Sequence, residues 1–265
     1  MNAAPVVVHD VGSVRVVTLD NPGSRNALSS ALNAALHRAL RNADDDPAVQ
    51  AVVLTGADPA FCAGVDLKEA AARGADYFAQ FDTVDGVGAA SRMGKPIIGA
   101  VNGAAFTGGL ELALGCDFLI ASERAVFADT HVRVGVIPGG GMTARLPHMV
   151  GSGWARRMSM AGEVVDAATA LRIGLVTEVT PHADLLPRAL SVAAAIADVP
   201  AVTMRALKQI YTTAAGTPLE AALGIETRIA TANPAELACL DDRRQAVMAR
   251  NRDQLRGAGQ VPGTR

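Results

Sequence analysis

Aromatic residues and cysteines are scarce in this chain of 265 residues. Phe, Trp and Tyr together make up only 3% of the sequence, so aliphatic side chains must form most of any core. The three cysteines, Cys62, Cys116 and Cys239, are widely spaced and form no Cys-x-x-Cys motif. An odd number of scattered cysteines argues against a disulfide scaffold and a zinc site, and it favours a reducing cytoplasm.

An excess of charge of either sign is also missing. The 24 basic and 26 acidic residues leave a formal net charge of -2, which indicates neither a nucleic-acid groove nor a polybasic membrane surface. No basic region followed by an apolar run opens the sequence, so we expect no secretory signal. The least charged stretch, residues 96–110, is too short and too rich in glycine to span a bilayer. We therefore expect a cytoplasmic protein with no nucleic-acid and no membrane partner.

Several common catalytic motifs do not occur. The sequence has no Gly-x-Ser-x-Gly nucleophile elbow, no Gly-x-Gly-x-x-Gly after a strand and no His-Glu-x-x-His. Residues 89–96 lack the first glycine and the Ser/Thr of a P-loop. The five histidines are scattered, so no metal site is expected. What remains is chemistry that depends on backbone donors and carboxylates.

A glycine-rich stretch over residues 95–117 offers such donors. An apolar run followed by Asn-Gly predicts a buried strand and a turn over residues 97–103. A helix is expected from Leu110, with Glu111 in its first turn. A helix start exposes unpaired N–H groups, and the glycine pair 108–109 lets a ligand approach, so this turn suits a developing oxyanion. The alternative is a core turn in which Glu111 merely complements the helix dipole.

A second loop repeats this arrangement. A strand over residues 50–55 leads into a glycine-bearing loop, residues 56–66, and a helix start is expected near Asp66. Two such turns can present two N–H groups to one oxygen. The helical stretch that follows, residues 67–92, is expected to be broken by its glycines at positions 74, 86 and 88.

The rest of the pattern is that of an α/β chain with a helical end. A hairpin is predicted over residues 6–19, and leucines at every fourth position from Leu28 to Leu40 predict an amphipathic helix. A composition shift near residue 200 predicts a core over residues 1–200 and a helical region over residues 201–265. The other predicted elements are strands 118–121, 125–128 and 175–179 and helices 142–150, 152–161, 166–173, 183–197, 201–214, 218–231 and 234–251.

These motifs together resemble those of the crotonase superfamily, which contains the enoyl-CoA hydratases, the isomerases and their relatives. The resemblance covers nearly the whole chain, and the two glycine-bearing loops at this spacing are its most specific part. The matching segments, in family order, are residues 21–22, 26–28, 61–67, 95–117, 135–139, 170–176 and 241–244.

The resemblance implies an α/β fold of the crotonase type, a spiral of repeated ββα turns with a helical C-terminal region. Residues 1–200 would carry the acyl-CoA site, and residues 201–265 would mediate a homotrimer or a dimer of trimers. The expected partner is an acyl-CoA thioester substrate. Coenzyme A is then part of the substrate, and no separate cofactor is expected.

The resemblance also implies an oxyanion hole in which the N–H groups of Val65 and Gly108 hold the thioester carbonyl oxygen. Addition of water to an α,β-unsaturated thioester builds negative charge on that oxygen, and one fixed donor is typically worth about 3–4 kcal/mol. The residues expected along the coenzyme A portion are Arg25, Ala63, Gly64, Asp66, Leu67 and Lys68.

One position departs from the pattern of the family's hydratases, in which two glutamates hold the water. The first corresponds to Glu111, but the second falls on His131. Losing one acid/base group lowers a rate by roughly 10²–10⁴. An imidazole titrates near neutral pH and can carry a proton in its place, or it can fill the pocket without acting. Asp129 would serve only if the loop turned differently. Thr107 stands where many members carry glycine, and we expect the turn to tolerate it.

The expected function is that of an enoyl-CoA hydratase-like lyase, with Glu111 and His131 as catalytic residues. An alternative is an acyl-CoA-binding protein with little or no turnover, and another is a different crotonase-type reaction such as isomerisation or C–C bond cleavage. The walls of the acyl pocket would come from residues 69–90 and 134–142. Phe78 and Phe81 either line that pocket or belong to the core, and the core is the usual place for aromatic side chains.

Overall fold

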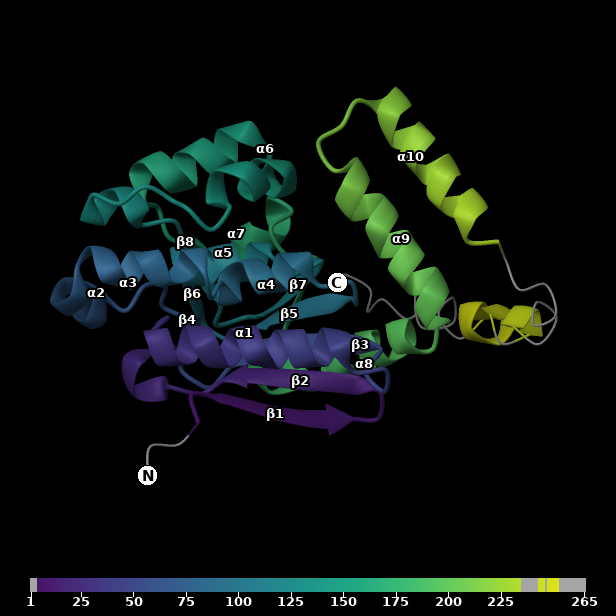
Figure 1. Ribbon diagram of the computed structural model, residues 1–265, viewed down its shortest axis with the longest axis horizontal. Coiled ribbons are helices and arrows are strands. Elements are labelled where there is room, and N and C mark those ends of the chain that lie inside the picture. Colours follow the sequence, from purple (N-terminus) through teal and green to yellow (C-terminus); the bar gives the residue numbers. More distant parts are fainter. Residues whose placement is uncertain (1–3, 235–242, 246, 253–265) are drawn as a thin grey trace, which may run out of the picture. The chain divides into compact units, whose positions relative to one another are not determined.

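The computed structural model describes residues 4–234, 243–245 and 247–252 (Figure 1). The strands are β1 (Val6–Val11), β2 (Val14–Leu19), β3 (Ala51–Gly56), β4 (Ala60–Cys62), β5 (Ile97–Val101), β6 (Ala104–Phe106), β7 (Phe118–Ser122), β8 (Val126–Ala128), β9 (Val165–Asp166) and β10 (Glu178–Thr180). The α-helices are α1 (Ser30–Asp45), α2 (Leu67–Arg73), α3 (Ala75–Ala79), α4 (Gly86–Arg92), α5 (Gly108–Leu114), α6 (Met142–Ala161), α7 (Ala167–Arg172), α8 (Leu185–Ala197), α9 (Ala201–Ala214) and α10 (Leu219–Ala232). Single 3₁₀ turns are η1 (Pro22–Ser24), η2 (Gln80–Asp82), η3 (His131–Val134) and η4 (His182–Asp184).

The chain divides into two compact units, Met1–Gln209 and Ile210–Arg265. All the strands of the described residues belong to the first unit. The boundary lies inside α9, whereas the predicted helical region begins at residue 201. That residues 201–265 mediate the assembly of a trimer or a dimer of trimers stays a prediction.

Two sheets organise the first unit. The larger has the order β1-β2-β3-β5-β7-β10, in which β1 pairs antiparallel with β2 and the other neighbours are parallel. The smaller has the order β4-β6-β8-β9. The pairs β3–β4, β5–β6 and β7–β8 each place their first strand in the large sheet and their second in the small one, and α2 and α5 follow the first two pairs. This repetition is the ββα spiral that the sequence predicts.

Both faces of the large sheet are covered, as expected for strands made of continuous apolar runs. On one face, α1 buries Leu32, Leu36 and Leu40, and Figure 1 shows this helix running along β1 and β2. On the other face, α8 buries Leu185 and Ala189 against the strands. The four-residue leucine repeat therefore predicts the buried face of α1 correctly.

Several features of the predicted helices differ in the structure. Leu28 lies before α1, which Ser29 caps, and Leu28 instead pairs with Val65 in a short parallel bridge. Helix α5 begins at Gly108, two residues before the predicted start. Gly86 and Gly88 lie inside α4 and do not break it.

The reason for the glycine at position 86 is a close approach between helices. The N–H of Gly86 donates to Asn33 Oδ1 at 2.8 Å, and a Cβ at this position would lie 2.7 Å from the same oxygen. Gly74, in contrast, has a φ of 58° and ends α2 as predicted. Gly86 thus permits two helices to pack closely, whereas Gly74 ends a helix.

Short strands account for most of the other differences. The sequence pattern misses β4, β6 and β9, and it places β10 at residues 175–179. Helices 142–150 and 152–161 form the single element α6, which is kinked at Gly151 where φ is 75°. The helix predicted over residues 234–251 falls partly outside the described residues, as do Asp241 and Asp242 of the last matching segment and Cys239.

Within the described residues no single helix is long and apolar enough to cross a membrane. The segments 182–197 and 201–214 pass that test only as a pair, by length and composition, with a bend of 107° between them.

A prediction concerns Gly109, where α5 approaches β4. A Cβ on Gly109 would lie 2.1 Å from the carbonyl oxygen of Cys62, so Gly109→Ala forces the backbone to shift. We expect this variant to lose about 1–3 kcal/mol of unfolding free energy, measured by urea titration. The control is Gly153→Ala in α6, where a Cβ meets nothing within 4 Å. Alanine there should gain roughly 0.5–1 kcal/mol, and equal losses in both variants would contradict the packing argument.

Candidate active site

A cavity of about 500 Å³ opens in the first unit between α4, α5 and the loop that leads into α6. It contains the predicted catalytic and oxyanion residues together. Its lining consists of Leu28, Val65, Phe78, Phe81, Asp82, Asp85, Val87, Gly88, Arg92, Gly108, Glu111, His131, Val136, Ile137, Gly139, Gly140, Gly141 and Arg145.

The backbone nitrogens of Val65 and Gly108 lie beside each other in this cavity. A Cβ on Gly108 would lie 3.8 Å from the nitrogen of Val65, and a Cβ on Gly64 would lie 3.1 Å from the nitrogen of Gly108. Within the described chain, neither N–H donates to a protein acceptor, whereas the neighbouring N–H of Leu28 donates to the Gly64 carbonyl at 2.7 Å. Two unpaired donors from loops far apart in sequence therefore converge on one place.

The first of these loops is held by backbone contacts. Gly64 has a φ of 89°, which favours glycine, and a Cβ there would lie 2.7 Å from the carbonyl oxygen of Phe106. The N–H of Ala63 donates to the carbonyl of Arg25 at 3.0 Å, and the Asn26 side chain donates to the carbonyl of Ala60 at 2.7 Å. The segments of Arg25 and Ala63, both predicted along coenzyme A, thus lie next to each other.

The other predicted coenzyme A residues follow at the start of α2. Asp66 caps this helix by accepting from the N–H groups of Lys68 and Glu69. Leu67 is 60% exposed although it is apolar, and Lys68 is exposed beside it. None of these side chains lines the cavity itself, but Val65, which precedes them, does.

Thr107 precedes the second donor in an unusual backbone conformation. Its φ of 55° and ψ of -117° are rarely adopted by β-branched residues, and such strain costs about 1–3 kcal/mol. Two contacts hold it: its N–H donates to the carbonyl of Ala128 at 2.9 Å, and its hydroxyl lies 2.7 Å from that of Thr130. The turn tolerates threonine, and the N–H of Gly108 remains free.

Glu111 lies in the first turn of α5 with its side chain only 6% exposed. Its Oε1 accepts from the N–H of Gly140 at 2.8 Å and from that of Met142 at 3.1 Å. Burial raises the pKa of Glu111, and the Met142 N–H and His131 oppose this shift only in part. A carboxyl whose pKa is raised in a cavity is a candidate proton carrier.

His131 faces Glu111 from the loop after β8. Its Nε2 lies 3.7 Å from Oε2 of Glu111, and its side chain is 4% exposed. Its Nδ1 lies 2.7 Å from Oδ1 of Asp129. The structure therefore brings Glu111 and His131 to one gap, and it adds a second carboxylate behind the imidazole.

The predicted segments contribute to the cavity walls, and of the two places considered for Phe78 and Phe81 the structure shows the cavity rather than the default core. Both line the cavity, and Phe78 is 43% exposed. Val136 and Ile137 also line the cavity, and Ile137 is 81% exposed.

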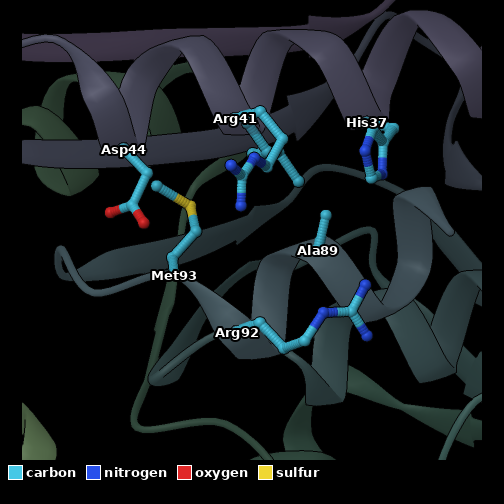
Figure 2. Close-up of a pocket in the computed structure, with 7 residues that line it drawn as sticks. His37, Arg41, Asp44, Ala89, Arg92 and Met93 are labelled. Carbon is cyan, nitrogen blue, oxygen red and sulfur yellow. The ribbon is translucent and has the colours of Figure 1, made fainter. Parts of the chain in front are cut away.

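A second, smaller hollow of about 270 Å³ lies between α1 and α4 (Figure 2). His37, Arg41 and Asp44 extend into it from α1, and on the other side lie Arg92, the last residue of α4, and Met93, which follows it. Asp44 accepts from the N–H of Gly94 at 3.0 Å, and Arg92 pairs with Asp85 at 3.0 Å. Asp44 thus links α1 to the segment after α4, whereas the Arg92–Asp85 pair lies within α4 and its N-cap.

Several residues of the site were not predicted as such. The N–H groups of Gly140 and Met142 hold Glu111, and Arg145 stabilises their turn by donating to the Gly140 carbonyl at 2.7 Å. In the sequence, the glycine run at residues 139–141 is the feature that indicates this turn. Asp129 was predicted only as a possible replacement acid. Its contact with His131 depends on a local turn that no sequence pattern indicates.

The fold and the cavity define a spiral ββα protein with a paired-amide site beside a buried carboxylate. The chain matches the family model described as enoyl-CoA hydratase/isomerase over residues 10–243. This protein belongs to that family, which lies within the crotonase superfamily.

Individual relatives agree with this assignment. The chain is 41% identical over 199 residues to a probable enoyl-CoA hydratase of Rhizobium meliloti (strain 1021), covering 74% of this chain and 77% of the relative. Among solved structures, an enoyl-CoA hydratase from Mycobacterium smegmatis is 47% identical with a TM-score of 0.72, covering 86% of this chain and 97% of that one. One from Bacillus anthracis is 30% identical with a TM-score of 0.84, covering 94% and 96%.

Proposed function

We propose that this protein is an enoyl-CoA hydratase-like lyase that adds water across the double bond of a 2-enoyl-CoA. The observation that carries the proposal is the pair of unpaired amides, Val65 and Gly108, beside Glu111 and His131 in one cavity. Family membership supports the same chemistry.

In the proposed reaction, the amides of Val65 and Gly108 receive the thioester oxygen. A water held between Glu111 Oε2 and His131 Nε2 gives its hydroxyl to the β-carbon, and the electrons move to the thioester oxygen. One of the two side chains takes the proton of the water, and the other protonates the α-carbon as the enolate collapses. The separation of 3.7 Å suits this exchange, because one oxygen can lie within hydrogen-bond distance of both atoms.

The substrate's coenzyme A is proposed to lie along Arg25, Ala63, Gly64, Asp66, Leu67 and Lys68. Support comes from the backbone contact between Arg25 and Ala63 and from the exposed start of α2. We propose no cofactor beyond the coenzyme A of the substrate, and a cytoplasmic location in fatty acid metabolism.

We also propose a homotrimer or a dimer of trimers. In support, α10 buries only Ile225 within the described chain and leaves Leu219 76% and Leu223 55% exposed. Exposed apolar helix faces of this kind mark interaction surfaces. Light scattering on the purified protein measures the mass of the assembly.

The test of the proposed activity is hydration of crotonyl-CoA and of longer 2-enoyl-CoA thioesters, followed by loss of the conjugated double bond. Turnover that Glu111→Ala abolishes is the expected result. The second candidate is an acyl-CoA-binding protein, which the histidine at position 131 favours. Tight binding of acyl-CoA in calorimetry, without turnover at any chain length, would establish that candidate and reject the lyase.

A further inference from the structure

The imidazole of His131 is held from behind by a buried carboxylate. Oδ1 of Asp129 lies 2.7 Å from His131 Nδ1 and also accepts from the His131 backbone N–H at 3.2 Å. The side chain of Asp129 is only 1% exposed. Such a short contact with a buried carboxylate requires a proton on Nδ1, because two lone pairs would otherwise face each other.

The charge state of Asp129 agrees with this arrangement. Burial alone would raise the pKa of Asp129, but interactions with His131 first, and with the Ser159 hydroxyl, keep that pKa below the ordinary value. Its other oxygen, Oδ2, is buried and has no hydrogen-bond partner in the described chain. The low pKa keeps Asp129 ionised, and its Oδ1 bonds to both the ring and the backbone N–H of His131.

We propose that Asp129 is a positioning residue: it fixes His131 in the tautomer with the proton on Nδ1, so that Nε2 faces Glu111 and the water. This inference rests on the proposed function of the site and deepens it, because it explains how histidine replaces a carboxylate there. When Nε2 gains a proton during the reaction, Asp129 stabilises the imidazolium. When Nε2 gives that proton up, the imidazole returns to its starting tautomer.

The pairing has a consequence for glutamate at position 131. In His131→Glu, the new carboxylate would lie beside Asp129 and face Glu111, which places three acids in one buried cluster. Like charges at such distances disfavour ionisation. Asp129 should therefore help a histidine at position 131 and hinder a glutamate there.

The experiment compares wild type, Asp129→Asn, His131→Glu and the double variant Asp129→Asn/His131→Glu in enoyl-CoA hydration. With His131 present, Asp129→Asn should lower kcat about 10²-fold and leave KM nearly unchanged. With glutamate at position 131, the same Asp129→Asn change should raise kcat. Loss of kcat in both backgrounds, or in neither, would overturn the proposal, because a merely structural Asp129 gives no reversal of sign.

A spectroscopic measurement tests the same inference without turnover. In protein labelled with ¹⁵N-histidine, the His131 ring signals, identified by their loss in His131→Gln, should show the proton on Nδ1 in wild type. They should show the other tautomer or a mixture in Asp129→Asn. If wild type does not hydrate any enoyl-CoA, the proposed function fails, and this spectrum alone decides the role of Asp129. An unchanged tautomer in Asp129→Asn rejects that role.

The chain offers a matched control in a second aspartate–histidine pair away from the cavity. His182 Nε2 lies 2.9 Å from Oδ2 of Asp58, and its Nδ1 lies 2.9 Å from the hydroxyl of Ser122. His182→Gln, which leaves Asp58 and its hydrogen bond with Asn102 in place, should remove the ring signals of His182 and leave kcat at the wild-type value. A loss of kcat equal to that of Asp129→Asn would show that any lost aspartate–histidine contact lowers activity, and the proposal would fail.

Discussion

Glu111→Gln is expected to lower kcat for enoyl-CoA hydration by about 10²–10⁴-fold, because it removes one of the two proton carriers of the site. Glutamine keeps the shape of the side chain and still accepts from the N–H groups of Gly140 and Met142, which now bond to Glu111 Oε1. Substrate affinity should therefore change little. Steady-state kinetics measure kcat and KM separately.

The same variant is expected to be more stable than wild type at neutral pH. Burial raises the pKa of Glu111, so the folded state holds its proton to a higher pH than the unfolded state does. The stability that this proton supplies is present at acid pH and is lost as the pH rises through the folded-state pKa. Glutamine cannot ionise, so the stability difference between variant and wild type should grow with pH.

Thermal unfolding between acid and neutral pH measures this difference. A kcat close to that of wild type would remove Glu111 from the mechanism. A variant that becomes less stable relative to wild type as the pH rises would show that the carboxylate is stabilised in its ionised form, contrary to the effect of its burial.

Gly108→Pro is expected to lower kcat by about 10²–10³-fold, because it deletes one oxyanion donor. Gly108 is the first residue of α5, where proline is well tolerated because the N–H has no helical acceptor. The variant thus removes the proposed function of the amide while the helix keeps its bonds. The loss should appear in kcat rather than KM, since the donor acts most strongly on the enolate.

Gly108→Ala is the matched control for this prediction. It introduces the same Cβ, 3.0 Å from the Cδ1 of Leu28, but it keeps the N–H. Circular dichroism and thermal unfolding establish that both variants fold, which matters because the preceding Thr107 has a ψ of -117°. Equal activity in the alanine and proline variants would contradict the oxyanion role of Gly108.

The sequence predicted the parts of the fold that depend on local periodicity. The run Ile97–Val101 is a buried strand with the predicted limits, and the leucine repeat of α1 faces the sheet. The two glycine-bearing loops allowed the position of the site to be predicted. The glycines at positions 64 and 109 lie at backbone contacts that a Cβ would obstruct. Such signals are local, and so they are visible in one sequence.

Features that depend on distant contacts were not predicted. Strands β4 and β6 each have three residues, too few for a periodic pattern, and they exist because their neighbours in the small sheet pair with them. Phe78 lines the cavity because of how α3 is placed, which composition does not reveal. The contact of Asp129 with His131 is local in sequence, but it depends on the conformation of the turn into η3, which no sequence pattern indicates.

The contacts of Gly64 with Phe106 and of Gly109 with Cys62 join main chain to main chain. The wall formed by Phe78, Phe81 and Val87 belongs instead to short helices outside both loops. In the proposed function, the oxyanion donors and the wall beside the acyl chain therefore come from separate sets of residues. In that function, substitutions in the wall would let the site accept other acyl groups, while the two amide donors would still point at the thioester oxygen.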